Sequence, residues 1–304
     1  MHISARLQCT IEMLDIFFQS RAPFDIIMAK FFKNNKWIGS HDRREIADFS
    51  YSIFRNYEII KYYTSHITEK LGRFFVLTFL KMQGSSEDKI ADIFSGKPHS
   101  PSKLTDFEKR FLASLDKTTE LPVNAKLNYP QWMDSYFRNA FSDSDFENEM
   151  KALNEKAFVD LRINTLKSTK DEVKHLLSQT GFLFEDSKLT ANGIRILKGR
   201  IGRNHDVIAK GLAEIQDEGS QLVAQICNAN STDTVVDFCA GAGGKTLALA
   251  ASMNNKGRIF ALDKYHERLQ NAKLRFRRAG VNNVFVRKLL VSGLKDIKNV
   301  RILF

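Results

Sequence analysis

The sequence predicts a multidomain protein with an all-α N-terminal domain, a small α+β segment and a Rossmann-like α/β domain at its end. Apolar residues recur at helical spacing over residues 1–125. A strand–helix–strand pattern follows within residues 126–215, and an apolar run, a glycine-rich turn and a helix-forming run follow in that order from residue 234. The length of 304 residues allows two or three domains.

The N-terminal 125 residues are expected to be helical. Ser40 and Asp42 are candidate N-caps for the second of the two helices that the apolar spacing predicts, and 95–103 reads as a loop. Phe74 and Phe75 are expected in a core rather than on a base-stacking surface. The two apolar stripes are Ile11, Leu14, Phe17 and Phe18, and Ile46, Phe49, Ile53 and Phe54.

The segment 126–215 is expected to form a small α+β unit. Arg162 and Asn164 alternate along one predicted strand, so both side chains would lie on one face and could reach a phosphate or a ribose. An ion pair and a turn-capping amide explain the same two residues equally well. The predicted elements are a turn into a helix at 129–132, strands at 158–163 and 194–197, and a helix at 168–181.

The last part, 216–304, alternates strands and helices as a parallel α/β sheet does. Gly280 is the expected helix stop after the second helix, whose buried stripe is Leu269, Ala272, Phe276 and Ala279. The predicted strands are 234–238, 258–263 and 284–286, with a fourth beginning within 299–304, and the helices are 245–253 and 266–279.

The stretch VVDFCAGAGGKT at 235–246 is the strongest motif. It predicts a strand, a tight turn and a helix N-terminus, where free N–H groups can meet a ligand. Asp263 ends the next predicted strand, which is where doubly wound folds accept ribose hydroxyls. An acid at Asp237, before the glycines, suits a ligand with an ammonium group and an adenosine but no phosphates, as in S-adenosylmethionine (SAM).

Three other interpretations of this loop stay open. A P-loop would end in Gly244-Lys245-Thr246, but Cys239 stands where its first glycine belongs. A dinucleotide fingerprint would lack its third glycine, since Gly241 and Gly243 are followed by no glycine at the required position. A purely structural turn is the remaining alternative.

The loop FCAGAGGKT at 238–246 resembles the cofactor loop of the Sun family of RNA cytosine-5 methyltransferases. Three further segments are similar to that family and occur in its order: DRR at 42–44, LRINTLK at 161–167 and QDEGSQ at 216–221. The resemblance extends over essentially the whole chain. It implies a NusB-like helical domain at 1–125, an RNA-binding insertion at 126–215 and part of a Rossmann-like SAM-binding methyltransferase domain at 216–304.

The resemblance also implies a function and a site. The function would be SAM-dependent cytosine-5 methylation of small-subunit ribosomal RNA. Arg162 and Asn164 would contact RNA, and Asp263 would bind the ribose of SAM. The remaining cofactor contacts would be Cys239, Ala240, Gly241, Ala242, Gly243, Gly244 and Lys245.

The chain departs from the family pattern in ways that concern catalysis. The family's two catalytic cysteines lie in segments that this sequence does not contain, so we expect a C-terminally truncated member with no catalytic residue of its own. Cys239 is expected to line the cofactor pocket rather than act as a nucleophile. The acid that normally follows strand 3 to hold adenine is missing at 289–292. Gly241-Ala242 replaces the usual alanine-proline, which would make the turn less rigid.

The net charge of +11 is concentrated in the last fifty residues. Residues 255–304 hold 13 basic and 3 acidic side chains, whereas the rest of the chain is almost neutral. A basic segment suits a phosphate backbone, although Lys273, Arg275, Arg277 and Arg278 could equally be a solvated helix face.

The three scattered cysteines form neither a disulfide framework nor a metal motif, and no apolar run is long enough to span a membrane. We therefore expect a cytoplasmic, monomeric RNA enzyme without metal. A non-catalytic RNA-binding protein and a nucleotide-dependent enzyme of another class, such as an NTPase or a dehydrogenase, remain alternatives.

Overall fold

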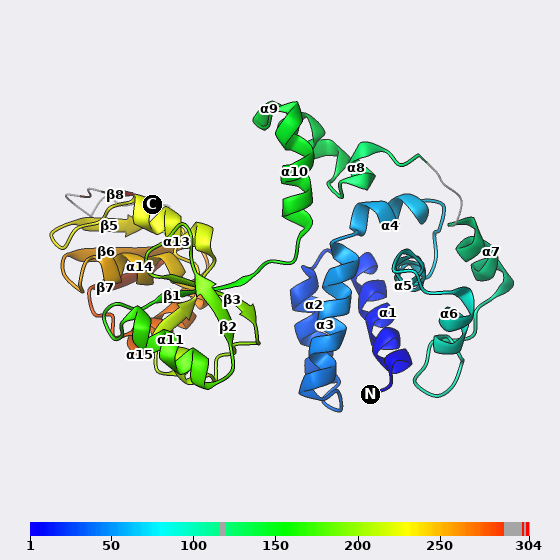
Figure 1. Cartoon of the computed structure of the whole chain (residues 1–304), viewed down its shortest axis with the longest axis horizontal. Coiled ribbons are helices and arrows are strands. Elements are labelled where there is room, and N and C mark those ends of the chain that lie inside the picture. The colour runs from blue at the N-terminus through cyan, green and yellow to red at the C-terminus, as the bar shows by residue number, and fades with distance from the viewer. Residues whose placement is uncertain (116–119, 289–299, 301, 304) are drawn as a thin grey trace. The chain divides into compact units, whose positions relative to one another are not determined.

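The computed structural model describes residues 1–115, 120–288, 300 and 302–303 (Figure 1). The chain forms two compact units, Met1–Lys156 and Ala157–Phe304. This division does not coincide with the predicted boundaries at 125 and 215, because the helices after residue 120 are tied to the N-terminal helices. The Asn128 side chain accepts a hydrogen bond from the amide of Glu58 and donates one to the carbonyl of Arg55, at 2.8 Å each.

The described part of the first unit is helical, as predicted. The core helix α5 is buried along Gly72–Leu80, and α1 packs against both α5 and α3. Phe74 and Phe75 are buried in this unit, which confirms their predicted core position. The helices are α1 Ile3–Gln19, α2 Phe24–Asn34, α3 Ser40–Phe54, α4 Tyr57–Tyr63, α5 Leu71–Met82, α6 Glu87–Ile93, α7 Asp106–Ser114, α8 Val123–Lys126, η1 Gln131–Met133, α9 Asp134–Ala140 and α10 Asp143–Asn154.

The predicted cap of α3 is wrong. The helix begins at Ser40 with Gly39 as its N-cap, and no side chain caps it. The Asp42 carboxylate is used elsewhere: it accepts hydrogen bonds from the amino group of Met1 at 3.0 Å and from Arg6 Nε at 2.9 Å. A carboxylate in the first helical turn is favourable with or without a capping bond, so the sequence pattern could not separate the two roles.

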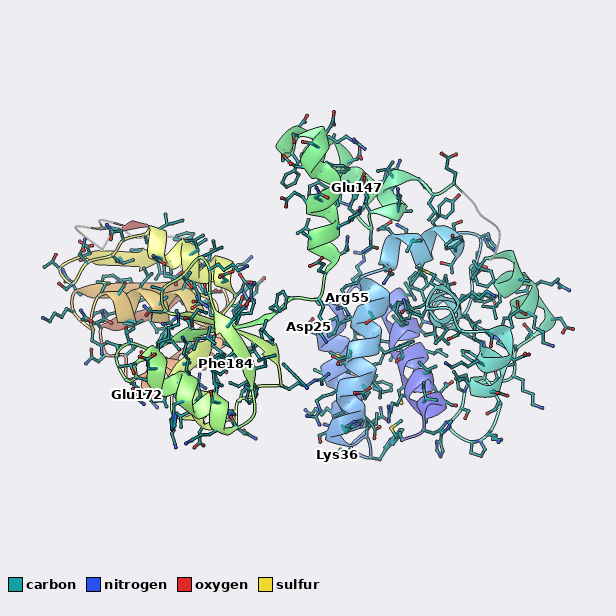
Figure 2. The ribbon with its side chains drawn as sticks, in the orientation of Figure 1. Asp25, Lys36, Arg55, Glu147, Glu172 and Phe184 are labelled. Carbon is teal, nitrogen blue, oxygen red and sulfur yellow. The ribbon has the colours of Figure 1, made fainter. Side chains whose placement is uncertain are left out.

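The second unit begins with a four-stranded antiparallel sheet in the order β2-β3-β1-β4. Its elements follow the β-α-β-β-α-β order of ferredoxin-like folds. Helix α11 starts with a capping box in which the side chains of Thr169 and Glu172 accept each other's backbone N–H groups. Glu172 is labelled in Figure 2. The elements are β1 Val159–Ile163, α11 Lys170–Gln179, β2 Leu183–Asp186, β3 Gly193–Lys198, α12 Asp206–Ala209 and β4 Ala213–Ile215.

The two faces of this sheet differ in chemistry. Leu161 and Ile163 pack with α11 residues in an apolar core. The alternate residues of the same strands, Asp160, Arg162 and Glu214, are polar and are also buried. A sheet that is buried on both faces, with one face polar, needs partners for those polar groups. The polar face therefore marks the contact with the rest of the second unit.

The remainder of this unit is a parallel sheet in the order β7-β6-β5-β8, flanked by helices. This α/β arrangement confirms the Rossmann-like prediction. Gly280 caps α15 in the left-handed conformation, and the predicted apolar stripe on that helix is buried. The elements are α13 Glu218–Ile226, β5 Thr234–Asp237, α14 Gly244–Ser252, β6 Arg258–Asp263, α15 His266–Ala279, β7 Val284–Lys288 and β8 Ile302–Leu303.

Candidate cofactor-binding site

The candidate site lies where the neighbouring strands β5 and β6 end. The two strands are parallel, with Asp237 opposite Ala261, so their carboxyl ends meet at one edge of the sheet. The loop after β5 and Asp263, the last residue of β6, share that edge. Open α/β sheets bind ligands at the carboxyl ends of their strands, next to the point where the strand order reverses.

Asp263 is held in a fixed orientation by two backbone amides. Its Oδ2 accepts a hydrogen bond from the N–H of Gly241 at 2.8 Å, and its Oδ1 accepts one from the N–H of Tyr265 at 2.7 Å. The residue is only 5% exposed. Each carboxylate oxygen has two lone pairs, so both oxygens can accept a further hydrogen bond from a ligand hydroxyl.

The glycines of the loop differ in how closely their surroundings approach them. Gly243 has φ +78°, and a Cβ there would lie 2.6 Å from the Phe276 ring. The loop packs so closely against α15 at this position that only glycine fits. A Cβ on Gly244 would meet nothing closer than Gln216 Nε2 at 3.8 Å. A side chain at Gly244 would therefore make only an ordinary van der Waals contact, so the start of α14 is not crowded and a ligand can approach its backbone.

Asp237 is a buried acid with an unsatisfied oxygen. It is 1% exposed, its Oδ2 accepts the Thr246 hydroxyl at 2.6 Å, and its Oδ1 has no partner among the described residues. Burial raises the pKa of this carboxyl above its ordinary value. The Thr246 hydroxyl is used by Asp237, so it does not stand free to hold a metal as the threonine of a P-loop does.

Arg275 of α15 joins the loop to the antiparallel sheet, a role that sequence reasoning did not find. Its Nη1 donates to the carbonyl of Ala242 at 2.8 Å, and its Nη2 donates to Oε2 of Glu214 at 2.9 Å. Arg278 Nη2 donates to the other Glu214 oxygen at 2.6 Å. These two arginines are thus ion-pair partners of a buried glutamate rather than a freely solvated basic face.

The structure brings the predicted cofactor residues together. The loop and the first turn of α14 lie beside Asp263, and Lys245 lies close enough to Asp237 to favour its charged form. The predicted loss of an adenine-binding acid falls on 289–292, outside the described residues. The seven predicted loop residues are Cys239, Ala240, Gly241, Ala242, Gly243, Gly244 and Lys245.

Arg162 and Asn164, for which the sequence left contact with RNA and a structural role open, are both buried. Asn164 is 2% exposed, and its Nδ2 donates to the carbonyls of Gly211 and Ala279 at 2.8 Å each. Both amide hydrogens are used within the chain, so contact of this amide with RNA would require those bonds to break. Arg162 is 6% exposed and donates from Nε to Gln216 Oε1 at 2.6 Å.

No group of three or more His, Cys, Asp or Glu side chains in the described ranges is placed to hold a metal ion. The three cysteines are not paired in disulfides. Within the part of the chain that the structure describes, no helix is both long and apolar enough to cross a bilayer.

The parallel sheet, the glycine turn and the acid at the end of the second strand define an α/β fold of the SAM-methyltransferase class. Residues 224–301 match the family model "16S rRNA methyltransferase RsmB/F", and residues 129–201 match the ferredoxin-like domain of "Methyltr_RsmF/B-like" proteins. Both matches are to methyltransferases of the RsmB/F type, which confirms the resemblance to the Sun proteins.

Individual relatives agree. A probable ribosomal RNA small subunit methyltransferase B of Synechocystis is 29% identical over 54% of this chain and 37% of its own length. A mouse 28S rRNA (cytosine-C(5))-methyltransferase is 28% identical over 40% of this chain and 30% of its length. The chain thus spans about a third of the length of these curated relatives.

The fold has a solved counterpart. The structure titled "Crystal Structure of PH0851" superposes with a TM-score of 0.69 at 20% identity, over 94% of this chain and 69% of that one.

Proposed function

We propose that this chain provides the cofactor-binding and RNA-binding parts of a SAM-dependent RNA cytosine-5 methyltransferase that acts on small-subunit ribosomal RNA. The observation that carries the proposal is the fixed Asp263 carboxylate beside an open glycine turn. The family-model match and the names of the relatives support RNA as the substrate. SAM would supply the transferable methyl group as a sulfonium.

The roles of the loop residues follow from their positions. Asp263 would accept the ribose hydroxyls of SAM, since both of its oxygens are oriented and retain lone pairs. Residues 239–245 would line the methionine and adenosine moieties. The buried Asp237, with one unsatisfied oxygen, supports a cationic group nearby. Cys239, which is exposed in this loop, would contact the cofactor.

We assign no catalytic residue in this chain. A cytosine-5 methyltransferase needs a cysteine thiolate that adds to the base, and low pKa and access make a thiol reactive. Cys9 is buried among the N-terminal helices, where burial raises its pKa to about 11. Burial also raises the pKa of Cys227. Cys239 belongs to the cofactor loop, so methyl transfer by this 304-residue chain alone is not expected.

RNA binding would involve the ferredoxin-like sheet and the basic C-terminal segment. Lys273 and Arg277 of α15 are exposed and make no ion pair among the described residues, which leaves them available to phosphates. Arg162 and Asn164 lie on the strand that the resemblance assigns to RNA binding, and their burial supports a role in holding that strand. The helical unit would be NusB-like, and the protein would act as a cytoplasmic monomer.

The test is isothermal titration of the full chain with SAM, followed by an assay of methyl transfer from labelled SAM to ribosomal RNA. We expect saturable SAM binding without turnover. RNA binding in the absence of any SAM binding would favour a non-catalytic RNA-binding protein instead. Tight binding of a nucleoside triphosphate, with none of SAM, would indicate a nucleotide-dependent enzyme of another class.

A further inference from the structure

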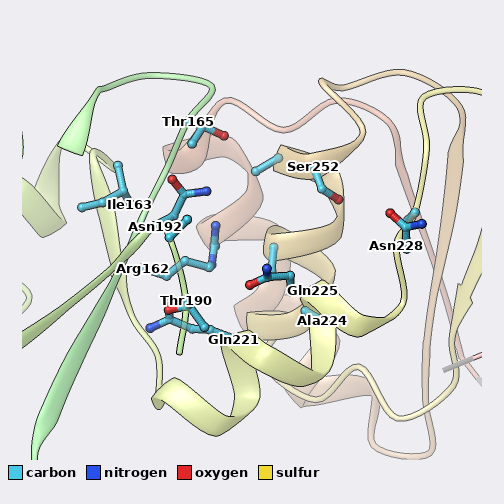
Figure 3. A pocket seen from close by; sticks show the side chains of 14 residues that line it. Arg162, Ile163, Thr165, Thr190, Asn192, Gln221, Ala224, Gln225, Asn228 and Ser252 are labelled. Carbon is cyan, nitrogen blue, oxygen red and sulfur yellow. The ribbon is translucent and has the colours of Figure 1, made fainter. Parts of the chain in front are cut away.

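A cavity of about 280 Å³ lies in the second unit, between the antiparallel sheet and helices α13 and α14 (Figure 3). It is lined by residues of β1, of the turn before β3 and of both helices. No residue of the cofactor loop 239–244 lines it. The cavity is thus separate from the candidate SAM site, and its volume is at the small end for ligand pockets.

The Arg162 guanidinium is directed into this cavity, between Asn192 and Gln225 in the view of Figure 3. Its Nε is used by Gln216, but among the described residues no group accepts a hydrogen bond from Nη1 or Nη2. Neither nitrogen is fully buried, so both are accessible from the cavity. Four N–H donors therefore face a space that the protein itself does not fill.

The charge of Arg162 is also left without a direct counter-ion. Glu214 lies opposite Arg162 in the sheet and favours its charged form, but its carboxylate is bonded to Arg275 and Arg278. No carboxylate among the described residues forms an ion pair with Arg162. Burying an unpaired charge is costly, so a site that keeps one is suited to a ligand of opposite charge. Burial lowers the pKa of Arg162 to about 10, which still leaves the group charged at neutral pH.

The rest of the lining combines neutral hydrogen-bonding groups with Ile163 and five alanines. The side chains of Thr165, Asn192, Gln225 and Asn228 line the cavity and make no hydrogen bond with other described residues. No Asp or Glu lines it. One cation ringed by amides and a hydroxyl fits a small anion with several acceptor oxygens better than a cation or an apolar molecule.

We propose that this cavity is a binding site for a small oxyanion of the phosphate type, anchored by Arg162 and surrounded by Asn192 and Gln225. The guanidinium fork matches two oxygens of a phosphate at once, and the amides can donate to the remaining oxygens. The proposal does not rest on the proposed methyltransferase function, because the cavity and the cofactor loop share no residue. SAM titration and phosphate titration can therefore succeed or fail separately.

The test uses the full chain and inorganic phosphate, titrated by calorimetry and by thermal unfolding against sodium chloride at equal ionic strength. We expect saturable binding and a rise in Tm that chloride does not reproduce. Arg162→Gln removes the charge and should weaken phosphate binding at least about tenfold. Ala248→Leu should reduce binding by filling the cavity from α14 without changing any charge. Arg203→Gln, at an exposed arginine outside the cavity, is the control and should bind phosphate as the parent does.

Two results would overturn the proposal: phosphate and chloride acting alike, or phosphate binding that survives both cavity variants. If Arg162→Gln fails to fold, Ala248→Leu still tests the proposal, because it fills the cavity and leaves the arginine in place. A short single-stranded RNA added in competition identifies the source of the oxyanion. Displacement of phosphate by the RNA would assign the site to an RNA phosphate, and simultaneous binding would assign it to a free anion.

Discussion

The N–H of Gly241 donates a hydrogen bond of 2.8 Å to Oδ2 of Asp263, so the glycine turn after β5 is tied to the end of β6. One carboxylate therefore does two things. It fixes the loop, and it presents its remaining lone pairs to the space where a ribose would lie. A variant that keeps the first task and weakens the second can separate cofactor binding from loop structure.

Asp263→Asn is that variant. The asparagine carbonyl can still accept the Gly241 N–H, but its NH2 group then faces the Tyr265 N–H, and the negative charge that strengthens bonds to ribose hydroxyls is lost. We expect SAM affinity to fall about tenfold or more, and the free energy of unfolding to fall by about 1–3 kcal/mol from the lost Tyr265 bond. Isothermal titration measures the affinity, and Asp171→Asn, on the exposed first turn of α11, is the control. Equal SAM affinity for Asp263→Asn and the parent would remove Asp263 from the site.

The two glycines at the start of α14 form a matched pair. Gly243→Ala forces a Cβ into the Phe276 ring at a φ of +78°. The same change at Gly244 makes only an ordinary van der Waals contact, with Gln216 at 3.8 Å. We expect Gly243→Ala to lower the free energy of unfolding by about 1–3 kcal/mol, from overpacking and backbone strain. Gly244→Ala should leave stability unchanged or slightly raised, because alanine is the better helix former.

Denaturant unfolding measures the stability of both glycine variants, and SAM titration measures binding. An added methyl group at Gly244 should reduce SAM affinity if the cofactor lies against the backbone at the start of α14. Equal stabilities for the two alanine variants would contradict the packing argument.

The order and type of most elements could be predicted because their signals are local. The periodic stripe Leu269, Ala272, Phe276 and Ala279 predicts both α15 and its buried face. Gly280 predicts the end of that helix, and the Asp237 and Asp263 positions follow from the ends of two apolar runs. These features depend on neighbours within a few residues along the chain.

The contacts that join distant segments could not be predicted in this way. Glu214 and Arg275 are far apart in sequence, and the type of each residue does not show which residue it pairs with. The burial of Arg162 has the same cause, because its strand is polar on the face that turns toward α13 and α14. Strand alternation predicts that Arg162 and Asn164 share a face, but not that this face is buried.

Glu214→Gln tests the link between the antiparallel sheet and the cofactor loop. Glu214 is 2% exposed and accepts from both Arg275 and Arg278, so its neutralisation leaves two partly buried cations without a partner. We expect a loss of about 2–3 kcal/mol, below the cost for a fully buried pair because the arginines keep some contact with water. SAM affinity should fall as well, since Arg275 then holds the Ala242 carbonyl less firmly.

Denaturant unfolding and SAM titration provide the two measurements for Glu214→Gln. Asp206→Asn is the control, because its ion pair with Lys210 is exposed and should matter little to stability. A stability loss for Glu214→Gln without any change in SAM affinity would mean that Arg275 supports the fold but does not position the loop.

Asp237 should make the stability of the second unit depend on pH. Burial raises the pKa of Asp237 in the folded chain above the ordinary value of about 3.9 that applies when it is unfolded. Between these two values the folded state binds a proton that the unfolded state does not. Stability from this group is therefore greatest at low pH and falls as pH rises through the folded pKa.

Asp237→Asn keeps an acceptor for the Thr246 hydroxyl and removes the titration. We expect the free energy of unfolding of the parent, relative to that of Asp237→Asn, to decrease from about pH 4 upward and then level off. Denaturant unfolding of both proteins at several pH values provides the difference, and a difference that grows with pH would show that the carboxylate is stabilised as an anion in the folded chain.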